Sequence, residues 1–311
     1  MRIVFFGSPP FAEDSFGALL NSPHKPVALV TAPPRRAGRG RKEVVNPMVV
    51  AAEAAAVPVL RPSSARADEF LQQLRDLKPD LGVVVSYGQI LSDELLAIPT
   101  HGCINVHGSL LPRWRGASPV QAAILAGDAE SGVCVQKMVA ALDAGDVLAS
   151  RSLVLSPDER AFELFDRLKR LGAELLVDFL NDVGDGPLPA GEVQDESAVT
   201  FCKRIRPQQG RISWQQSSQQ VDRVVRAMAG WPWAQAQLPN GDTVRILRGE
   251  ASAYQHEAGP VGEVLRTEGG IFVRCGEGVF RIDELQRSGK AALPSAEFLR
   301  GFALKVGESL T

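Results

Sequence analysis

Apolar runs alternate with segments of helical periodicity through the beginning of the chain. The runs that are almost continuously apolar have the character of parallel strands buried on both faces, at residues 3–6, 27–30, 57–60 and 81–85. Segments with helical spacing of apolar residues separate them, at residues 11–20, 48–56 and 68–77. This alternation predicts βαβ units and an α/β fold with a Rossmann-like, mainly parallel sheet.

A further strand is predicted at residues 102–107, with polar side chains near its end. Cys103, Ile104 and Val106 are apolar, and Gly108 ends the run. Alternate side chains of a strand share a face, so Asn105 and His107 are expected on one face and Val106 on the other. The carboxyl ends of strands in such sheets open the ligand crevice. From the residues alone, two interpretations stay open: a reactive amide and imidazole, or an Asn and a His that only satisfy backbone groups.

The sheet is predicted to continue with an antiparallel return. Residues 133–139 and 147–155 have strand character, and Leu142-Asp143-Ala144-Gly145-Asp146 separates them. This turn would bring Asp143 back beside His107. A carboxylate there would hold the imidazole in place. Asp146 is the second choice for that role, and a turn-capping function suits it as well.

The end of the chain predicts a second, smaller domain. Residues 183–206 are rich in Gly and Pro, as linkers are. Several short strands with Gly-rich turns follow, which is typical of a small β-barrel. We therefore expect a catalytic domain at residues 1–182, a linker at 183–206 and a barrel domain at 207–311. Trp231 and Trp233 suit a hinge and core at least as well as a stacking surface.

Composition narrows the classes of protein. The 311 residues are 45% hydrophobic and 23% charged, with a net charge of −2, so nucleic acid would need a local basic patch. The four cysteines form no Cys-x-x-Cys pair and the four histidines have no zinc-type spacing, which predicts no metal site and free thiols in the cytoplasm. No apolar run reaches the length of a membrane span. Gly7-Ser8-Pro9-Pro10 lacks the later glycines of a dinucleotide fingerprint.

Such a local basic patch lies between the second strand and the next helix. Residues 33–43 carry five basic residues and one acidic residue, and Gly38 and Gly40 give the segment several backbone shapes. A long cationic loop on a near-neutral protein favours a polyanion over a solvated charge run. The candidate contacts are Arg35, Arg36, Arg39, Arg41 and Lys42. A second basic group, around the start of the second domain, comprises Lys203, Arg204, Arg206 and Arg211, and it suits phosphate contacts or a solvated hinge.

The stretch Asn105-Val106-His107-Gly108-Ser109-Leu110-Leu111-Pro112, followed later by Leu142-Asp143-Ala144-Gly145-Asp146, resembles the formyltransferase family that uses 10-formyltetrahydrofolate. Residues 104–119 are most similar to its tRNA-formylating branch, and the likeness extends through nearly the whole chain. The resemblance implies that Asn105, His107 and Asp143 are the catalytic triplet. It implies that the barrel is of the oligonucleotide-binding (OB-like) type.

The resemblance also implies the substrates. The formyl donor would be 10-formyltetrahydrofolate, and the acceptor would be the α-amine of methionine on initiator tRNA. The folate would bind to a strand-end loop, a turn and one carboxylate, namely Ser86, Tyr87, Gly88, Gln89, Ile90, Ser109, Leu110, Leu111, Pro112 and Asp146. The basic loop would enter the acceptor stem of the tRNA, through Ala37-Gly38-Arg39-Gly40. A monomer without membrane contact is expected.

The sequence departs from the family in one strand and leaves rival functions open. Cys134 stands where relatives usually have Thr, and Lys137 and Val139 also differ from the family pattern, which affects the folate pocket. Glycinamide ribonucleotide or a nucleotide amino-sugar is an alternative acceptor, although the basic loop and second domain disfavour a small one. A non-catalytic RNA-binding protein is the other alternative, which the intact triplet disfavours. The sequence gives no basis for the discrimination of initiator from elongator tRNA.

Overall fold

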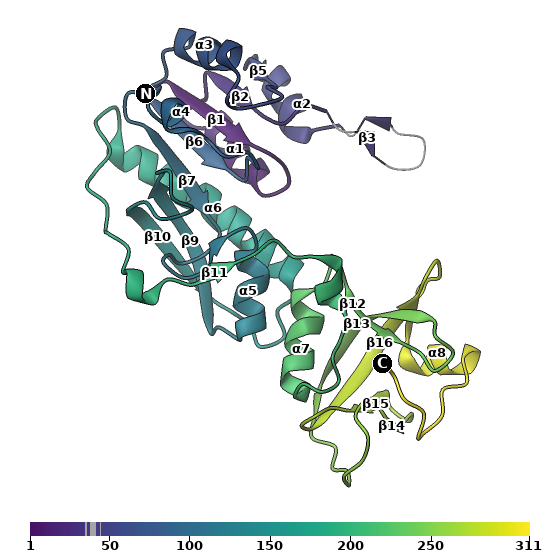
Figure 1. Ribbon diagram of the computed structural model, residues 1–311. Coiled ribbons are helices and arrows are strands. Elements are labelled where there is room, and N and C mark those ends of the chain that lie inside the picture. The colour runs from purple at the N-terminus through teal and green to yellow at the C-terminus, as the bar shows by residue number, and fades with distance from the viewer. Residues whose placement is uncertain (35, 38–41, 44) are drawn as a thin grey trace. The chain divides into compact units, whose positions relative to one another are not determined.

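The computed structural model describes the chain except for residues 35, 38–41 and 44, and for residues 36, 37, 42 and 43 it describes the backbone alone. The chain divides into two compact units (Figure 1). The first comprises residues 1–119, 130–154 and 165–202. The second comprises residues 120–129, 155–164 and 203–311.

In the first unit, the described residues form a seven-stranded sheet in the order β10-β9-β7-β6-β1-β2-β5. The parallel strands are β1 (Ile3–Gly7), β2 (Ala28–Val30), β5 (Val59–Leu60), β6 (Leu81–Val85) and β7 (Cys103–His107). At one edge, β9 (Glu130–Lys137) is antiparallel to β7, and β10 (Val147–Val154) is antiparallel to β9. The predicted mainly parallel sheet is therefore confirmed, and it ends in the antiparallel return.

Helices lie against both faces of this sheet, and they are α1 (Ala12–Leu20), α2 (Pro47–Ala54), α3 (Asp68–Asp76), α4 (Asp93–Leu96) and α6 (Ala161–Val183). Phe5 packs against Phe16 of α1, with ring centroids 5.2 Å apart. Val4 and Phe6 point to the other face, into a buried cluster with side chains of α3 and α4. This two-sided burial is the physical reason for the continuous apolar character of β1. The four-residue helix α4 was not predicted, because it is too short to show a period.

An antiparallel sheet forms the core of the second unit. Its order is β12-β13-β16-β15-β14, with β17 paired to β16. The strands are β12 (Ala234–Gln237), β13 (Thr243–Ser252), β14 (Val264–Arg266), β15 (Ile271–Arg274), β16 (Val279–Arg287) and β17 (Ala292–Pro294). The other α-helices among the described residues are α5 (Pro119–Ala126), α7 (Ser218–Ala227) and α8 (Ser295–Gly301). The predicted small barrel is confirmed as an antiparallel half-barrel.

The segment that leaves α6 returns along the first unit. A short 3₁₀ turn, η1 (Glu196–Ala198), precedes β11 (Phe201–Cys202), which pairs in parallel with β8 (Arg115–Gly116). A second 3₁₀ turn, η2 (Pro207–Gly210), begins the second unit. The pairing of β8 with β11 ties this Gly- and Pro-rich stretch to the turn that follows β7.

In the described part of the chain, no helix has the length and apolar character needed to cross a bilayer.

Candidate active site

The strand β7 presents Asn105 and His107 on one face of the sheet, as the alternation predicted. Val106 points to the opposite face, where its side chain borders Gly172 of α6. The neighbouring strand β9 pairs Gln136 with Asn105 and Cys134 with His107. Directly opposed residues of an antiparallel pair share a face, so these four side chains form one cluster at the strand ends.

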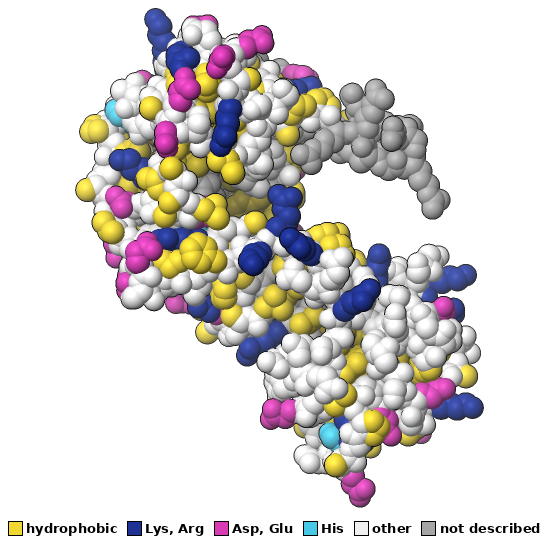
Figure 2. Space-filling model, viewed as in Figure 1, with side chains coloured by type: hydrophobic (Ala, Val, Ile, Leu, Met, Phe, Trp, Pro, Cys, Tyr) yellow, Lys and Arg dark blue, Asp and Glu magenta, His cyan; other side chains and the backbone are white. Residues whose placement is uncertain are grey.

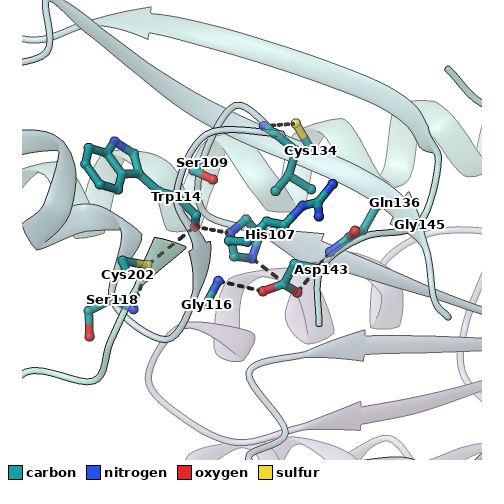
Figure 3. A network of polar contacts seen from close by, with 12 residues as sticks. His107, Ser109, Trp114, Gly116, Ser118, Cys134, Gln136, Asp143, Gly145 and Cys202 are labelled. Atoms are coloured by element: carbon teal, nitrogen blue, oxygen red, sulfur yellow. Dashed lines mark hydrogen bonds and ion pairs between the residues drawn. The ribbon is translucent and has the colours of Figure 1, made fainter. Parts of the chain in front are cut away.

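The imidazole of His107 is buried, with 6% of the residue exposed, between two oxygen acceptors (Figure 3). Nε2 lies 3.0 Å from the carbonyl oxygen of Trp114. A carbonyl can only accept, so Nε2 carries the proton in this contact. Nδ1 lies 3.8 Å from Oδ1 of Asp143, close enough for an ion pair. The structure therefore places the Asp143 carboxylate beside the His107 imidazole, as the turn between the two strands predicted.

The carboxylate of Asp143 is fixed by two donors besides its approach to His107. The backbone N–H of Gly116 donates to Oδ2 at 2.8 Å, and Nε2 of Gln136 donates to Oδ1 at 3.1 Å. Asp143 itself adopts a φ of 50°, in the left-handed region. Two residues on, a Cβ on Gly145 would lie 1.7 Å from the carbonyl oxygen of Lys137, so only glycine allows the turn to approach β9 so closely.

A buried amide and a buried guanidinium hold the backbone of this turn. Nε2 of Gln194 donates to the carbonyl oxygens of Asp143 and Gly145, at 2.8 and 2.7 Å. Nε of Arg115 donates to Oε1 of Gln194 at 3.0 Å, and Nη2 donates to Oε1 of Glu196 at 2.8 Å. Sequence reasoning missed Gln194 and Glu196, because they lie in the Gly- and Pro-rich stretch, and it gave Arg115 no role.

The turn after β7 contains the predicted folate residues Ser109, Leu110, Leu111 and Pro112. Oγ of Ser109 is buried and donates to the carbonyl oxygen of Arg113 at 2.6 Å. The N–H of Leu111 lies 3.4 Å from Sγ of Cys134. Ser109 thus closes the turn, and the thiol at the position where the family usually has Thr contacts the turn's backbone.

The far end of this turn is held by the returning segment. The N–H of Trp114 donates to Oγ1 of Thr200 at 2.9 Å. The carbonyl of Trp114 accepts from Sγ of Cys202 at 3.4 Å, in addition to its bond from His107. The carbonyl that orients the imidazole is thereby connected to β11.

The predicted folate residues after β6 lie beside this centre, because β6 pairs with β7 and Val84 is opposite Asn105. Tyr87 is buried against Phe6, with ring centroids 5.6 Å apart, and burial raises the pKa of its hydroxyl to about 12. Oε1 of Gln89 accepts from the N–H of Ala65 at 2.8 Å.

Three other predicted folate residues, Ser86, Gly88 and Ile90, lie on the exposed loop after β6. Ser86 and Gly88 have φ values of 49° and 83°, which bend the chain away from β6. Ile90 is 77% exposed. Ser86, Gly88 and Ile90 are therefore all exposed at this rim. Asp146, the other predicted folate residue, is half-buried, and its carbonyl accepts from the N–H of Lys137 at 2.9 Å.

The predicted cationic contacts differ in how far the structure describes them. Arg35, Arg39 and Arg41 lie outside the described residues. The backbones of Arg36 and Lys42 belong to two short antiparallel strands, β3 (Arg36–Ala37) and β4 (Lys42–Glu43). Lys and Arg side chains are visible on the surface in Figure 2. Lys203, Arg204 and Arg206 are exposed, and none of the three forms an ion pair with another described residue.

The thiols do not provide a nucleophile for this centre. Burial raises the pKa of Cys134 to about 11 and that of Cys103 to about 12. Burial also raises the pKa of Cys202, and the nearby Asp143 carboxylate adds to this effect. A thiol reacts as its thiolate, which such pKa values disfavour at neutral pH. Among the described residues, no group of His, Cys, Asp and Glu could hold a metal ion.

The geometry offers hydrogen-bond donors and one carboxylate acceptor on the same face of the sheet. Asn105 offers an amide that makes no hydrogen bond with the other described residues, and His107 offers a polarised ring beside the carboxylate of Asp143. An amide and an imidazole can donate to an oxygen that gains negative charge. A fixed carboxylate nearby can accept a proton.

Comparison with known proteins identifies the family of the chain. The family model described as formyl transferase matches residues 1–180, and the model of the formyl transferase C-terminal domain matches residues 204–303. A methionyl-tRNA formyltransferase of Stenotrophomonas maltophilia is 44% identical over 299 residues, covering 96% of this chain and 97% of the relative. One of Parvibaculum lavamentivorans is 42% identical over 313 residues, covering all of both chains.

Solved structures share the fold. HypX from Aquifex aeolicus, in complex with tetrahydrofolic acid, has a TM-score of 0.64 at 19% identity, covering 99% of this chain and 48% of that longer one. The sugar 3N-formyl transferase WlaRD, in the presence of dTDP and 5-N-formyl-THF, has a TM-score of 0.67 at 15% identity, covering 94% and 99%. At these identities the likeness concerns the fold alone.

A Rossmann-like domain followed by a half-barrel, each matched by a formyl transferase family model, is the architecture of a formyl transferase. The chain belongs to the methionyl-tRNA formyltransferase family.

Proposed function

We propose that the protein transfers the formyl group of 10-formyltetrahydrofolate to the α-amine of methionine on initiator tRNA, for translation initiation. One observation carries the proposal: Asn105 and His107 share a face of β7, with His107 beside the Asp143 carboxylate, in a chain that matches methionyl-tRNA formyltransferases over its whole length. The acceptor and the donor follow from the names of those relatives and from the family. The residue roles below follow from the geometry.

The transfer requires three steps that the centre can serve. The amine nitrogen attacks the formyl carbon, and its new C–N bond turns the formyl oxygen into an oxyanion. The nitrogen then loses a proton, and N10 of the folate gains one as its bond to the formyl carbon breaks. Each step moves charge or a proton at a defined atom, so fixed donors and one acceptor are sufficient.

We assign the oxyanion to Asn105 and His107. The Asn105 amide has donors left for a substrate, because it bonds none of the described residues. The Nε2–H of His107 is engaged by the Trp114 carbonyl, so Nδ1 is the nitrogen that faces the centre. Nδ1 donates to the oxyanion in the imidazolium form of the ring, in which both nitrogens carry a proton. Asp143 lies on that side and takes the proton of the amine, directly or through one water.

We assign the folate to the rim beside these residues. The loop at residues 86–91 follows β6, and the turn at residues 109–112 follows β7, so both lie at the carboxyl end of paired strands. This is the position at which parallel sheets bind ligands. Backbone groups, exposed or half-buried side chains and one carboxylate are available to contact the pterin, namely those of Ser86, Ile90, Leu110, Leu111, Pro112 and Asp146. The pocket differs from that of the family at Cys134, Lys137 and Val139.

We assign the tRNA to the cationic loop and to the start of the second domain. Arg35, Arg36, Arg39, Arg41 and Lys42 give the loop its charge density, and Lys203, Arg204 and Arg206 are exposed cations without acidic partners among the described residues. Phosphate pairing supplies affinity that depends on salt. The domain at residues 207–311 then serves as a tRNA-binding module, and the enzyme acts as a cytoplasmic monomer.

Acceptor choice tests the proposal directly. The protein is incubated with 10-formyltetrahydrofolate and, in parallel, with charged initiator tRNA, glycinamide ribonucleotide or a nucleotide amino-sugar. The proposal predicts formyl-methionyl-tRNA in the first reaction and no product in the others. Product only from a small amine would place the chain with another activity of the superfamily. tRNA binding without any product would make it a non-catalytic RNA-binding protein.

A further inference from the structure

The buried side chain of Gln136 lies at the middle of the reaction centre, although the mechanism above gives it no role. It projects from β9 directly opposite Asn105, on the face that carries His107. Only 2% of the residue is exposed. Its Nε2 donates to Oδ1 of Asp143 at 3.1 Å, and this is the same oxygen that approaches Nδ1 of His107.

The amide can adopt only one orientation with respect to this carboxylate. A carboxylate accepts hydrogen bonds and donates none, so the NH₂ group of Gln136 must face Asp143. The other amide atom, Oε1, is then directed away from it. Oε1 is buried and accepts no hydrogen bond from the residues that the structure describes.

An unpaired buried acceptor weakens a fold, so Gln136 is not placed there for stability. Leaving such a group unsatisfied costs the desolvation of the oxygen, and unpaired buried groups of this kind call for a functional explanation. A methionine has similar length and would pack at this position without the unpaired oxygen. The described partner of the Gln136 side chain is the catalytic carboxylate itself.

We propose that Gln136 is a positioning residue for formyl transfer, which fixes the Asp143 carboxylate toward His107. The two other contacts of Asp143 do not fix the position of Oδ1. The Gly116 N–H holds Oδ2, and Gln194 holds only the backbone of the turn. Without Gln136, Oδ1 loses its side-chain donor, and the carboxylate is free to turn about its Cβ–Cγ bond while only Oδ2 is held by the Gly116 N–H. The proton acceptor then spends less time at the attacking amine, which slows the chemical step.

The inference rests on the proposed function, and a steady-state comparison separates the two. Gln136→Met removes the donor and keeps the volume. Gln136→Glu keeps the shape and places a second carboxylate against Asp143. Val135→Ala is the matched control, because Val135 is the neighbouring residue on β9, is fully buried and faces away from the centre. For each variant, kcat, the KM of both substrates and the thermal midpoint are measured.

We expect Gln136→Met to lower kcat by about 10- to 100-fold with both KM values within about threefold of wild type, because the group acts in the chemical step. Its thermal midpoint should equal or exceed that of wild type. Gln136→Glu should lower kcat further. Val135→Ala should lower the thermal midpoint while kcat stays near wild type.

The inference is overturned if Gln136→Met or Gln136→Glu retains the wild-type kcat. It is also overturned if Gln136→Met loses thermal stability and activity together, as a packing residue would. A wild-type enzyme that formylates no tRNA would instead overturn the proposed function.

Discussion

The interior of the first unit is polar at one edge of its sheet, whereas the second unit is built around an apolar half-barrel. In the first unit His107, Arg115, Gln136 and Gln194 are all buried in the neighbourhood of Asp143. Gln136 donates to the Asp143 carboxylate and Gln194 to its backbone carbonyl, and Arg115 donates to Gln194. In the second unit, side chains of α7, α8 and the strands form a hydrophobic cluster. Buried polar groups cost stability unless they are paired. Their concentration around the ends of β7 and β9 therefore indicates a reactive site, where polar side chains are buried at a cost in folding stability.

Buried polar groups in the second unit serve the fold. Oγ of Ser295 donates to the carbonyl of Ile282 at 2.6 Å, at the start of α8. Nη2 of Arg274 pairs with Glu263 at 2.8 Å, on the neighbouring strand segment. Neither contact leaves a donor pointed at an open site. The comparison teaches that partners, rather than burial, distinguish a reactive polar group from a structural one.

The largest expected effect comes from removing the oxyanion donors. His107→Ala or Asn105→Ala should lower kcat by about 10² or more while folate and tRNA still bind, because the lost hydrogen bonds act in the transition state. Initial rates with charged initiator tRNA, together with binding of both substrates, measure this. Near-normal turnover in either variant would remove that residue from the catalytic centre.

A smaller effect is expected from the cationic loop. Arg39→Ala with Arg41→Ala should lower kcat/KM for tRNA by roughly tenfold or more at low salt, with folate affinity unchanged, since fewer phosphates are neutralised. Each lost phosphate contact should flatten the salt dependence by about one unit of slope. Rates across a salt series measure it. Arg66→Ala with Lys78→Ala removes the same charge elsewhere in the first unit. If the two pairs behave alike, the loop is only a solvated charge run.

A further effect on activity is expected from Gln194, whose amide holds the backbone of the Asp143 turn. Gln194→Ala should lower kcat by about tenfold, because the carbonyls of Asp143 and Gly145 lose their donor. Gln194→Glu keeps a partner for Arg115 but also lacks the NH₂ group, so it should be no better than Gln194→Ala. Restoration of activity by the Glu variant would show that Arg115, and not the turn, is what Gln194 serves.

The fold could be predicted well from the sequence, because its strands carry a strong periodic signal. Residues 3–6 and 81–85 are apolar throughout and became central strands, β1 and β6. The short elements could not be predicted. β8 and β11 have two residues each, too few for any period, and their pairing depends on a distant part of the chain. α8 was missed for a similar reason, since it has seven residues.

The site could be predicted only where residues lie close in sequence or share a motif. Asn105 and His107 followed from strand alternation, and Asp143 followed from the short turn between β9 and β10. Gln136 and Gln194 give no sequence signal, because a glutamine is ordinary on any surface. Their burial beside Asp143 is a tertiary property that only the fold reveals.

The smallest effect on activity is expected in the half-barrel. Ile282→Val removes one buried methyl group and should cost about 0.5–1.5 kcal/mol of unfolding free energy. The kcat per folded molecule should stay at the wild-type value, since Ile282 lies in the apolar cluster of the second unit. Denaturant unfolding and initial rates at one temperature measure both. A loss of kcat without a loss of stability would contradict the division between the two interiors.

The most direct test of the account is single-turnover formylation by Asp143→Asn, with charged initiator tRNA bound in advance and 10-formyltetrahydrofolate added rapidly. The amide keeps an oxygen for the Gly116 N–H but cannot accept the proton of the amine. We predict that the rate constant of the transfer falls by about 10² or more while the Kd of the tRNA is unchanged. A rate constant within about threefold of wild type would contradict the claim that the Asp143 carboxylate, held beside His107, receives the proton.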